Sequence, residues 1–265
     1  MAGTSIPFGV VTCPVYRYHP AIIAQAAATL DEMFPGRFFL CAGSGQALNE
    51  AITGERWPAK EERNQRLKEG VQMIRALWTG EETTQKGLVQ VEQAKLYTKP
   101  RTDIPIIGAA LTEETARWAG TWADGLISVA GEPEQTKTII DAFRSNGGKG
   151  RPVLLKVQVS FAKDRKKALE GAYDQWKTNV FGSKAQADLR SPAQYDELAK
   201  TVRPEDMEKH VLISNDPHEY IDRLRQYFDL GAEKLSIHNV NRDQEGFIDF
   251  FGREVLPGLE VNTDQ

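Results

Sequence analysis

The sequence predicts an α/β fold, a TIM (β/α)8 barrel from which two of the eight strand–helix units are absent. Short apolar, β-branched segments alternate with amphipathic helical segments along the chain, which favours parallel strands joined by right-handed crossovers. A complete barrel takes about 250 residues, or about 31 per unit. The chain has 265 residues, and a polar stretch at about 183–211 without strand character accounts for the remaining length. We therefore predict one incomplete barrel domain, residues 1–265, with a helical insertion at about 183–211.

The predicted strands share β-branched or apolar side chains and are mostly followed by small or turn-forming residues. They cover residues 6–12, 37–42, 104–109, 125–129, 153–161 and 234–239. Lys156 and Gln158 interrupt the fifth strand, which is otherwise apolar. A weaker alternating segment, residues 89–95, is expected to lie outside the main sheet.

The predicted helices share apolar residues at three- and four-residue spacing. They cover residues 20–34, 61–78, 113–119, 134–143, 164–180, 217–230 and 244–256. Pro35 and Gly36 end the first helix, and Gly231 ends the sixth. The sixth begins with Asp216 as its N-cap residue and Pro217 at its first position, which is the preferred arrangement for both residue types.

The composition argues against nucleic-acid and membrane partners. The formal net charge is −4, so no basic surface for nucleic acid is indicated. No apolar stretch approaches the ~18 residues that a membrane span needs, and no leader segment is visible, so we expect a cytoplasmic protein. Cys13 and Cys41 each lie at the end of an apolar strand, without a CxxC motif or a Cys/His cluster. We expect two buried free thiols and no metal site.

The carboxyl ends of the strands are where a barrel of this kind binds its ligand. Three of these ends are rich in small residues: Cys13 and Pro14 follow the first strand, residues 43–45 the second, and Ala110 the third. Small residues let a flat ligand approach the backbone closely, although glycine also serves turn geometry alone. The third end leads directly into a helix whose first free N–H groups, near Thr112, form a potential anion site.

Several side chains near these ends have two interpretations. His238, at the end of the last strand, is a candidate catalytic base or a hydrogen-bonded wall residue. Tyr18, which follows Arg17 after the first strand, contacts a cofactor or substrate, or belongs to a surface turn. Trp57 is a substrate contact or a packing residue at the rim. His19 begins a helix and is expected to be structural or substrate-facing rather than catalytic.

Four runs of the sequence resemble the luciferase-like flavin oxidoreductase superfamily. They are TCPVYRYHPAIIAQAAATLDEMFPGRFFLCAGSGQALNE (12–50), GERWP (54–58), ERNQRLKEGVQMIRALWTGE (62–81) and ADGLISV (123–129). The similarity is to the branch of the coenzyme F-420 (F420)-dependent glucose-6-phosphate dehydrogenases, and still more to relatives described as probable non-F420 flavin oxidoreductases. It implies a TIM (β/α)8 barrel of the bacterial-luciferase type whose first two βα units are missing from this chain. The isoalloxazine or deazaflavin ring is expected at the strand ends.

The resemblance also implies roles for individual residues. The ring is expected to rest against a bulge with a non-proline cis peptide bond, formed by Val10, Val11, Thr12 and Cys13. Its reactive face is expected beside Gly45, Gln46 and Asn49, and Gly43 is a further expected cofactor contact. Its phosphate tail is expected near Ala109, Ala110, Leu111 and Thr112. The predicted catalytic residues are Gln46 and His238, and the predicted substrate contacts are Tyr18, Trp57 and Lys209.

Three departures from the family pattern bear on the activity. The absent units carry an aspartate–histidine pair and a tryptophan, and the histidine and tryptophan serve hydride transfer in the sugar-phosphate enzymes. Gln46 stands where the family motif has glutamate, and an amide can form hydrogen bonds but carries no acidic proton at neutral pH. Of the residues that hold sugar phosphate in the family, only Lys209 has a counterpart, so glucose 6-phosphate is not the expected substrate.

We therefore expect a flavin- or deazaflavin-dependent oxidoreductase that transfers hydride to or from a small organic substrate, with monooxygenase activity open if the cofactor is an ordinary flavin. FMN and coenzyme F420 are nearly balanced, with a slight preference for FMN. The alternative is a catalytically impaired flavin-binding or oligomer-forming protein. Because six strands leave two unpaired sheet edges, we also expect a homodimer or a higher homo-oligomer.

Overall fold

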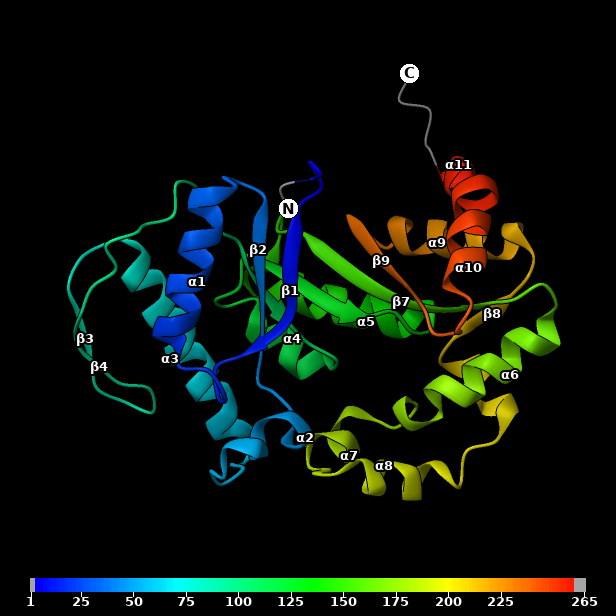
Figure 1. Ribbon diagram of the computed structural model, residues 1–265, viewed down its shortest axis with the longest axis horizontal. Helices are drawn as coiled ribbons and strands as arrows, with labels where there is room; N and C mark the ends of the chain where they lie inside the picture. Colours follow the sequence, from blue (N-terminus) through cyan, green and yellow to red (C-terminus); the bar gives the residue numbers. More distant parts are fainter. Residues whose placement is uncertain (1–2, 260–265) are drawn as a thin grey trace.

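The computed structural model describes residues 3–259, and its centre is one curled, all-parallel sheet (Figure 1). The strands follow the order β1-β2-β5-β6-β7-β8, and β9 pairs with β7 on the edge opposite β6. Their bounds are β1 (Phe8–Pro14), β2 (Phe38–Gly43), β5 (Ile106–Ala109), β6 (Gly125–Val129), β7 (Val153–Phe161), β8 (Leu212–Ser214) and β9 (Lys234–Asn239). The six predicted strands are all present, with ends that differ by at most two residues.

The seventh strand, β8, corrects the prediction. No strand is predicted between residues 161 and 234, but Leu212–Ser214 pairs in parallel with Val159–Phe161 of β7. Three residues are too few to show an alternating pattern, and a polar segment precedes them, so the sequence gives no usable signal. This strand continues the sheet beyond the carboxyl end of β6, where that side of β7 would otherwise be unpaired.

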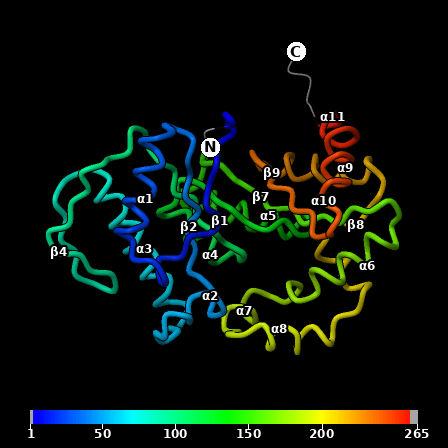
Figure 2. The backbone as a smooth tube through the Cα atoms, viewed as in Figure 1, coloured from blue at the N-terminus to red at the C-terminus, as the bar shows by residue number. Residues whose placement is uncertain are grey.

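Helices cover the outer face of the sheet (Figures 1 and 2). The longer ones are α1 (Pro20–Met33), α3 (Lys60–Trp78), α4 (Glu113–Ala119), α5 (Pro133–Phe143), α6 (Arg165–Trp176), α9 (Pro217–Asp229) and α10 (Gln244–Phe250). Asp216 caps α9 as predicted, because its carboxylate accepts the backbone N–H of His218 at 2.9 Å. The main core lies between these helices and the sheet, and fully buried members include Leu67, Leu155 and Leu224.

Two segments leave the strand–helix alternation. The hairpin β3 (Thr83–Gln85) and β4 (Val91–Ala94) forms a separate two-stranded antiparallel sheet beyond α3, as expected for residues 89–95. The predicted insertion is helical, with α7 (Ser183–Ala187), α8 (Pro192–Ala199) and a 3-10 segment at Pro204–Lys209. A small second core that contains Ala172 and Met207 joins it to α6. Two short helices, α2 (Ala47–Glu50) and α11 (Leu256–Leu259), complete the described chain.

The face of the sheet opposite the helices, which we call the inner face, has its own side chains. Alternation along β7 sends Leu155, Val157 and Val159 into the helix-covered core, so Lys156 and Gln158 occupy the inner face. Nearer the amino end of β7, the same face has a small apolar cluster of Cys41, Ile107 and Ile127, packed against Leu154. Within the described residues β1 pairs only with β2, and β9 only with β7, so the curl is open between these two strands.

Candidate active site

The strand ends bring several of the predicted cofactor residues together. A Cβ atom added to Gly43 would lie 3.4 Å from Cβ and Oγ1 of Thr12 and 3.5 Å from Cβ of Ala109. Thr12, Gly43 and Ala109 therefore adjoin one another across β1, β2 and β5. The absent side chain of Gly43 leaves a shallow slot between the other two, which we call the Gly43 slot.

The end of β1 has the irregular backbone that the resemblance implied. Its register against β2 shifts between Val10 and Cys13, and the peptide bond between Val11 and Thr12 is cis. Val11 is 55% exposed at this bulge, while Cys13 is half-buried. Burial raises the pKa of the Cys13 thiol, so this side chain is a neutral packing group rather than a nucleophile.

The turn after β2 is fixed by a glycine conformation and a buried carboxylate. Gly45 has a φ of 78°, a left-handed value that other residues adopt with strain. Glu50 of α2 is buried, and its Oε2 accepts the backbone N–H of Arg17 at 2.8 Å. Its other oxygen has no partner among the described residues, and burial raises the pKa of this carboxyl. Gln46 and Asn49 therefore lie on a turn that is tied to the loop after β1.

The third strand end leads into α4 as predicted. Thr112 is the N-cap residue, and its Oγ1 accepts the backbone N–H of Thr115 at 3.3 Å. The first turn of α4 carries Glu113 and Glu114, which place negative charge beside the free N–H groups. Leu111, immediately before the cap, is 50% exposed. The binding of a phosphate tail at this end stays a prediction.

On the other side of the opening, polar side chains gather on the inner face at the ends of β7 and β9. Gln158 is the Cα partner of His238 in the parallel ladder, and Lys156 that of Val129 on β6. Trp176, the last residue of α6, covers this group: its ring centroid lies 5.0 Å from that of His238, and Lys156 Nζ lies 5.6 Å from the Trp176 ring. We call Lys156, Gln158, Trp176 and His238 the inner polar cluster.

The electrostatics of this cluster favour a neutral imidazole at His238 beside a charged Lys156. Burial lowers the pKa of Lys156. The pKa of His238 is also lowered, first by burial and then by the positive charge of Lys156, so the imidazole is neutral at pH 7. Its Nδ1 is buried and has no partner among the described residues. A neutral imidazole with a free nitrogen can accept a proton from a bound hydroxyl group.

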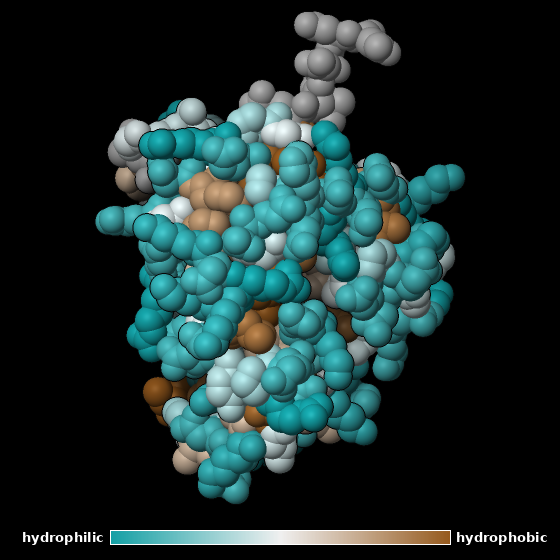
Figure 3. All heavy atoms as spheres, turned by 90° about the vertical axis from the view of Figure 1, so that its right-hand side faces the viewer, coloured by the Kyte–Doolittle hydropathy of each residue, from teal (hydrophilic) through white to brown (hydrophobic). Residues whose placement is uncertain are grey.

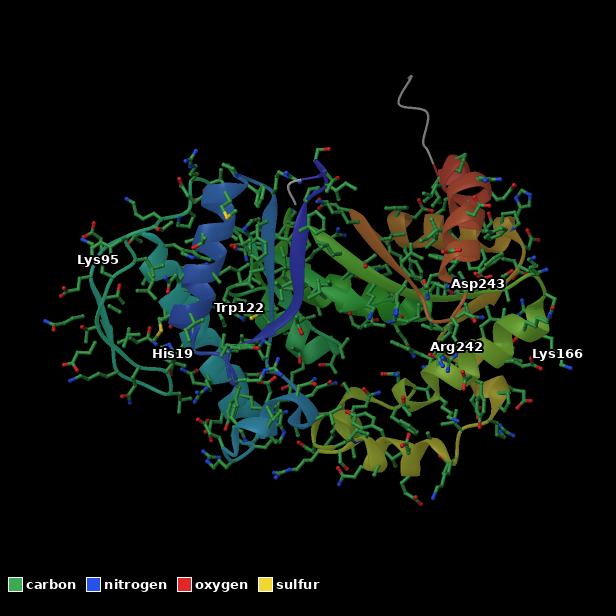
Figure 4. The ribbon with its side chains drawn as sticks, viewed as in Figure 1. His19, Lys95, Trp122, Lys166, Arg242 and Asp243 are labelled. Atoms are coloured by element: carbon green, nitrogen blue, oxygen red, sulfur yellow. The ribbon has the colours of Figure 1, made fainter. Side chains whose placement is uncertain are left out.

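A loop after β9 lies beside this cluster and is tied to α6. Arg242 extends from it toward α6 (Figure 4) and donates to Oδ2 of Asp174 at 2.9 and 3.1 Å. A cavity of about 450 Å³ lies there, and its lining includes Trp176, His238 and Arg242. A second cavity of about 430 Å³ lies between the end of β6, β8 and α9, and Gln158 lines it. The inner polar cluster therefore borders two spaces of the size of a small organic molecule.

The remaining predicted residues have structural contacts. Trp57 donates from Nε1 to Asp188 Oδ1 of the insertion at 2.9 Å. Tyr18 is exposed beneath the Arg17 guanidinium. Lys209 forms an ion pair with an aspartate of its own 3-10 segment and lines the second cavity. His19 caps α1 through Nδ1, which accepts an N–H at 3.2 Å (labelled in Figure 4). This contact fits the structural one of its two expected roles. The substrate contacts stay predictions.

Sequence reasoning did not assign three members of the inner polar cluster. Lys156 and Gln158 were visible as polar interruptions two residues apart in an apolar strand. That spacing places both on one face of a strand, which was the available signal. Trp176 gave no signal, because its helix position says nothing about which strand end it covers.

Comparisons with known proteins match this geometry. Residues 1–234 match the family described as luciferase-like monooxygenase. The chain belongs to this family. An F420-dependent glucose-6-phosphate dehydrogenase of Nakamurella multipartita is 36% identical over 264 residues, which cover 96% of this chain and 78% of that relative. Another from Microbacterium testaceum is 36% identical over 258 residues, which cover 94% and 76%.

Solved structures of related fold confirm the expected architecture at the level of an open, luciferase-like barrel. An F420-dependent secondary alcohol dehydrogenase in complex with an F420–acetone adduct has a TM-score of 0.87 and 27% identity, over 97% of this chain and 81% of that chain. The F420-dependent tetrahydromethanopterin reductase from Methanopyrus kandleri has a TM-score of 0.78 over 96% and 84%; its 22% identity shows the fold alone.

Residues 3–259 contain no group of three or more His, Cys, Asp or Glu side chains arranged to hold a metal ion. Within the same range, no helix has the length and apolar character required to cross a membrane.

Proposed function

We propose that the chain is an oxidoreductase that uses a deazaflavin, coenzyme F420, to exchange hydride with a small organic substrate. The curated relatives named above are F420-dependent, and each is 36% identical to this chain over the aligned residues. The observation that carries the proposal is the Gly43 slot beside exposed apolar side chains at the strand ends, Val11 and Leu111 among them. These residues suit a flat, largely apolar ring.

A deazaflavin bound in this slot would supply a ring carbon that takes or gives hydride. The chain's own residues would orient the substrate and handle the proton. When an alcohol is oxidised to a carbonyl compound, hydride leaves the carbon and the hydroxyl proton must go to a base. The free nitrogen of neutral His238 is our candidate for that base, and Gln46 is a candidate hydrogen-bond donor to the substrate or ring.

FMN is the other cofactor expected from the sequence. A solved constituent of a Baeyer–Villiger monooxygenase from Pseudomonas putida, in complex with FMN, has a TM-score of 0.71. Its identity to this chain is 16%, which supports the fold and nothing finer. We therefore place F420 first, and monooxygenase activity with FMN becomes an outcome of the test.

We further propose that β1 takes the place of the third strand of a complete barrel. The support is that a relative aligned with 96% of this chain is covered over only 78% of its own length, and that among residues 3–259 β1 pairs with β2 alone. An oligomer also stays a proposal. Figure 3, which views the side bearing α6, α9 and α10, shows a mainly hydrophilic surface, so we expect contacts between copies at the open β1–β9 side instead. Sedimentation velocity tests this.

The cofactor test is a titration of the purified chain with F420 and, separately, with FMN, followed by cofactor fluorescence. We expect saturable F420 binding and weaker FMN binding. Oxidation of bound reduced F420 by a panel of small ketones and aldehydes then separates an enzyme from a protein that only binds the cofactor. Saturable binding of FMN alone, or of neither cofactor, would overturn the proposal.

A further inference from the structure

We propose that the inner polar cluster binds an anionic oxygen group of the substrate, a carboxylate or a phosphate, and that Lys156 supplies the charge that holds it. The site is proposed from this chain's own contacts. The binding of an anion does not depend on the proposed function. The identification of that anion as part of the substrate rests on it.

The first observation is that Lys156 lacks an anionic partner. Its side chain is partly buried on the inner face, yet within residues 3–259 it forms no ion pair and no hydrogen bond. Its ammonium group instead lies over the face of the Trp176 ring. Lysine side chains are seldom buried without a partner, because an ammonium group loses hydration there. A tryptophan face offsets only part of that loss. A bound anion would supply the remainder.

The second observation is the unused amide of Gln158. This side chain is 6% exposed and points to the same face as Lys156, two residues earlier in the strand. Its Oε1 has no partner among the described residues, although buried amides are normally hydrogen-bonded. The amide can donate to an anion through nitrogen or accept from a hydroxyl group through oxygen, because the two ends are exchangeable by rotation. An oxygen-rich ligand satisfies either end.

The third observation is the position of His238 within the same cluster. Its free Nδ1 is buried beside the Trp176 ring, and its ladder partner is Gln158. A ligand held by Lys156 would thus keep its neighbouring carbon and hydroxyl group close to the candidate base. This arrangement fits a small hydroxy or oxo compound that carries a carboxylate or a phosphate within a few bonds of the reacting carbon.

The test measures anion binding to the full, cofactor-free chain by isothermal titration calorimetry, with glycolate and inorganic phosphate as separate probes. We expect the wild type to bind at least one probe, and the tighter of the two identifies the group. Lys156→Met should weaken that binding more than tenfold, and Lys156→Arg should retain it within a few-fold. The matched control is Lys95→Met, because Lys95 lies 6.0 Å from the Tyr97 ring on the strand β4 side of the molecule, away from the sheet (Figure 4).

Absence of binding of both probes to the wild type, or equal binding by wild type and Lys156→Met, would overturn the inference. Should the methionine variant not fold, imidazole NMR of the wild type decides, since the His238 signal must move on probe addition while that of His19 stays fixed. The F420 titration is independent of this experiment. If the chain binds F420 but neither anion, this inference alone is rejected. If it binds an anion but not F420, the proposed function alone is rejected.

Discussion

The substitution Gly43→Ala separates a cofactor slot from an ordinary strand end. The added Cβ would lie 3.4 Å from the Thr12 side chain and 3.5 Å from Ala109, which is normal van der Waals contact. Glycine within a strand costs about 0.5–1 kcal/mol relative to alanine. We therefore expect the free energy of unfolding to stay the same or to rise by up to about 1 kcal/mol.

The cofactor titration should show the opposite effect. The methyl group would fill the slot against which the ring is proposed to rest, so the ring must move away from Thr12 and Ala109. We expect F420 affinity to fall by about tenfold, which corresponds to about 1.4 kcal/mol. Urea unfolding and fluorescence titration on the same preparation measure the two quantities.

The control for this experiment is Gly252→Ala. No atom lies within 4 Å of a Cβ built on Gly252, which is part of a helical segment after α10, so alanine should stabilise the chain without changing F420 affinity. If Gly43→Ala binds F420 as tightly as the wild type, the slot is not the ring site. If it unfolds more easily than the wild type, the packing argument itself is wrong.

Three further predictions follow from other residues. Gln46→Glu should raise the rate of hydride transfer, while Gln25→Glu on the exposed side of α1 should not; equal rates in wild type and Gln46→Glu would count against a proton-bearing role at position 46. Lys156→Met should raise the pKa of His238, measured by NMR titration, because the nearby positive charge is lost; an unchanged pKa would place the two groups further apart than the structure does. Asp31→Asn should destabilise the chain by about 2 kcal/mol at pH 7. Burial alone would raise the pKa of Asp31, but its hydrogen bonds lower it below the unfolded value. The difference in unfolding free energy between wild type and Asp31→Asn, measured by urea unfolding, should therefore shrink as pH falls below about 4. A difference that does not change with pH would show that the Asp31 carboxylate is not stabilised in this way.

The fold could be predicted largely because its strands are buried against helices and its helices are amphipathic. A segment with neither property carries no usable pattern. Strand β8 has only three residues and owes its conformation to the unpaired end of β7. The paired strands β3 and β4 are partly polar, so only their position outside the alternation was predictable.

The candidate site divides in the same way. Its apolar half lies at the ends of β1, β2 and β5, and the small residues at these strand ends are visible in the sequence. Its polar half combines Lys156, Trp176 and His238, which lie on three different elements. Only the register between β7 and β9 and the place where α6 ends bring them together, and neither can be obtained from single-sequence patterns.

The carboxylate introduced by Gln46→Glu would act on the same substrate group as the positive charge of Lys156. In this chain an amide stands where the family motif has a carboxylate, and an ammonium group lies on the inner face of the same opening. A substrate anion held by Lys156 would be repelled by a new carboxylate at position 46, even if that carboxylate speeds proton transfer. We therefore expect Gln46→Glu to raise kcat and also to raise KM for anionic substrates, with no increase in KM for neutral ones. A parallel rise in KM for neutral substrates would point to a steric effect and against an anion bound in this site.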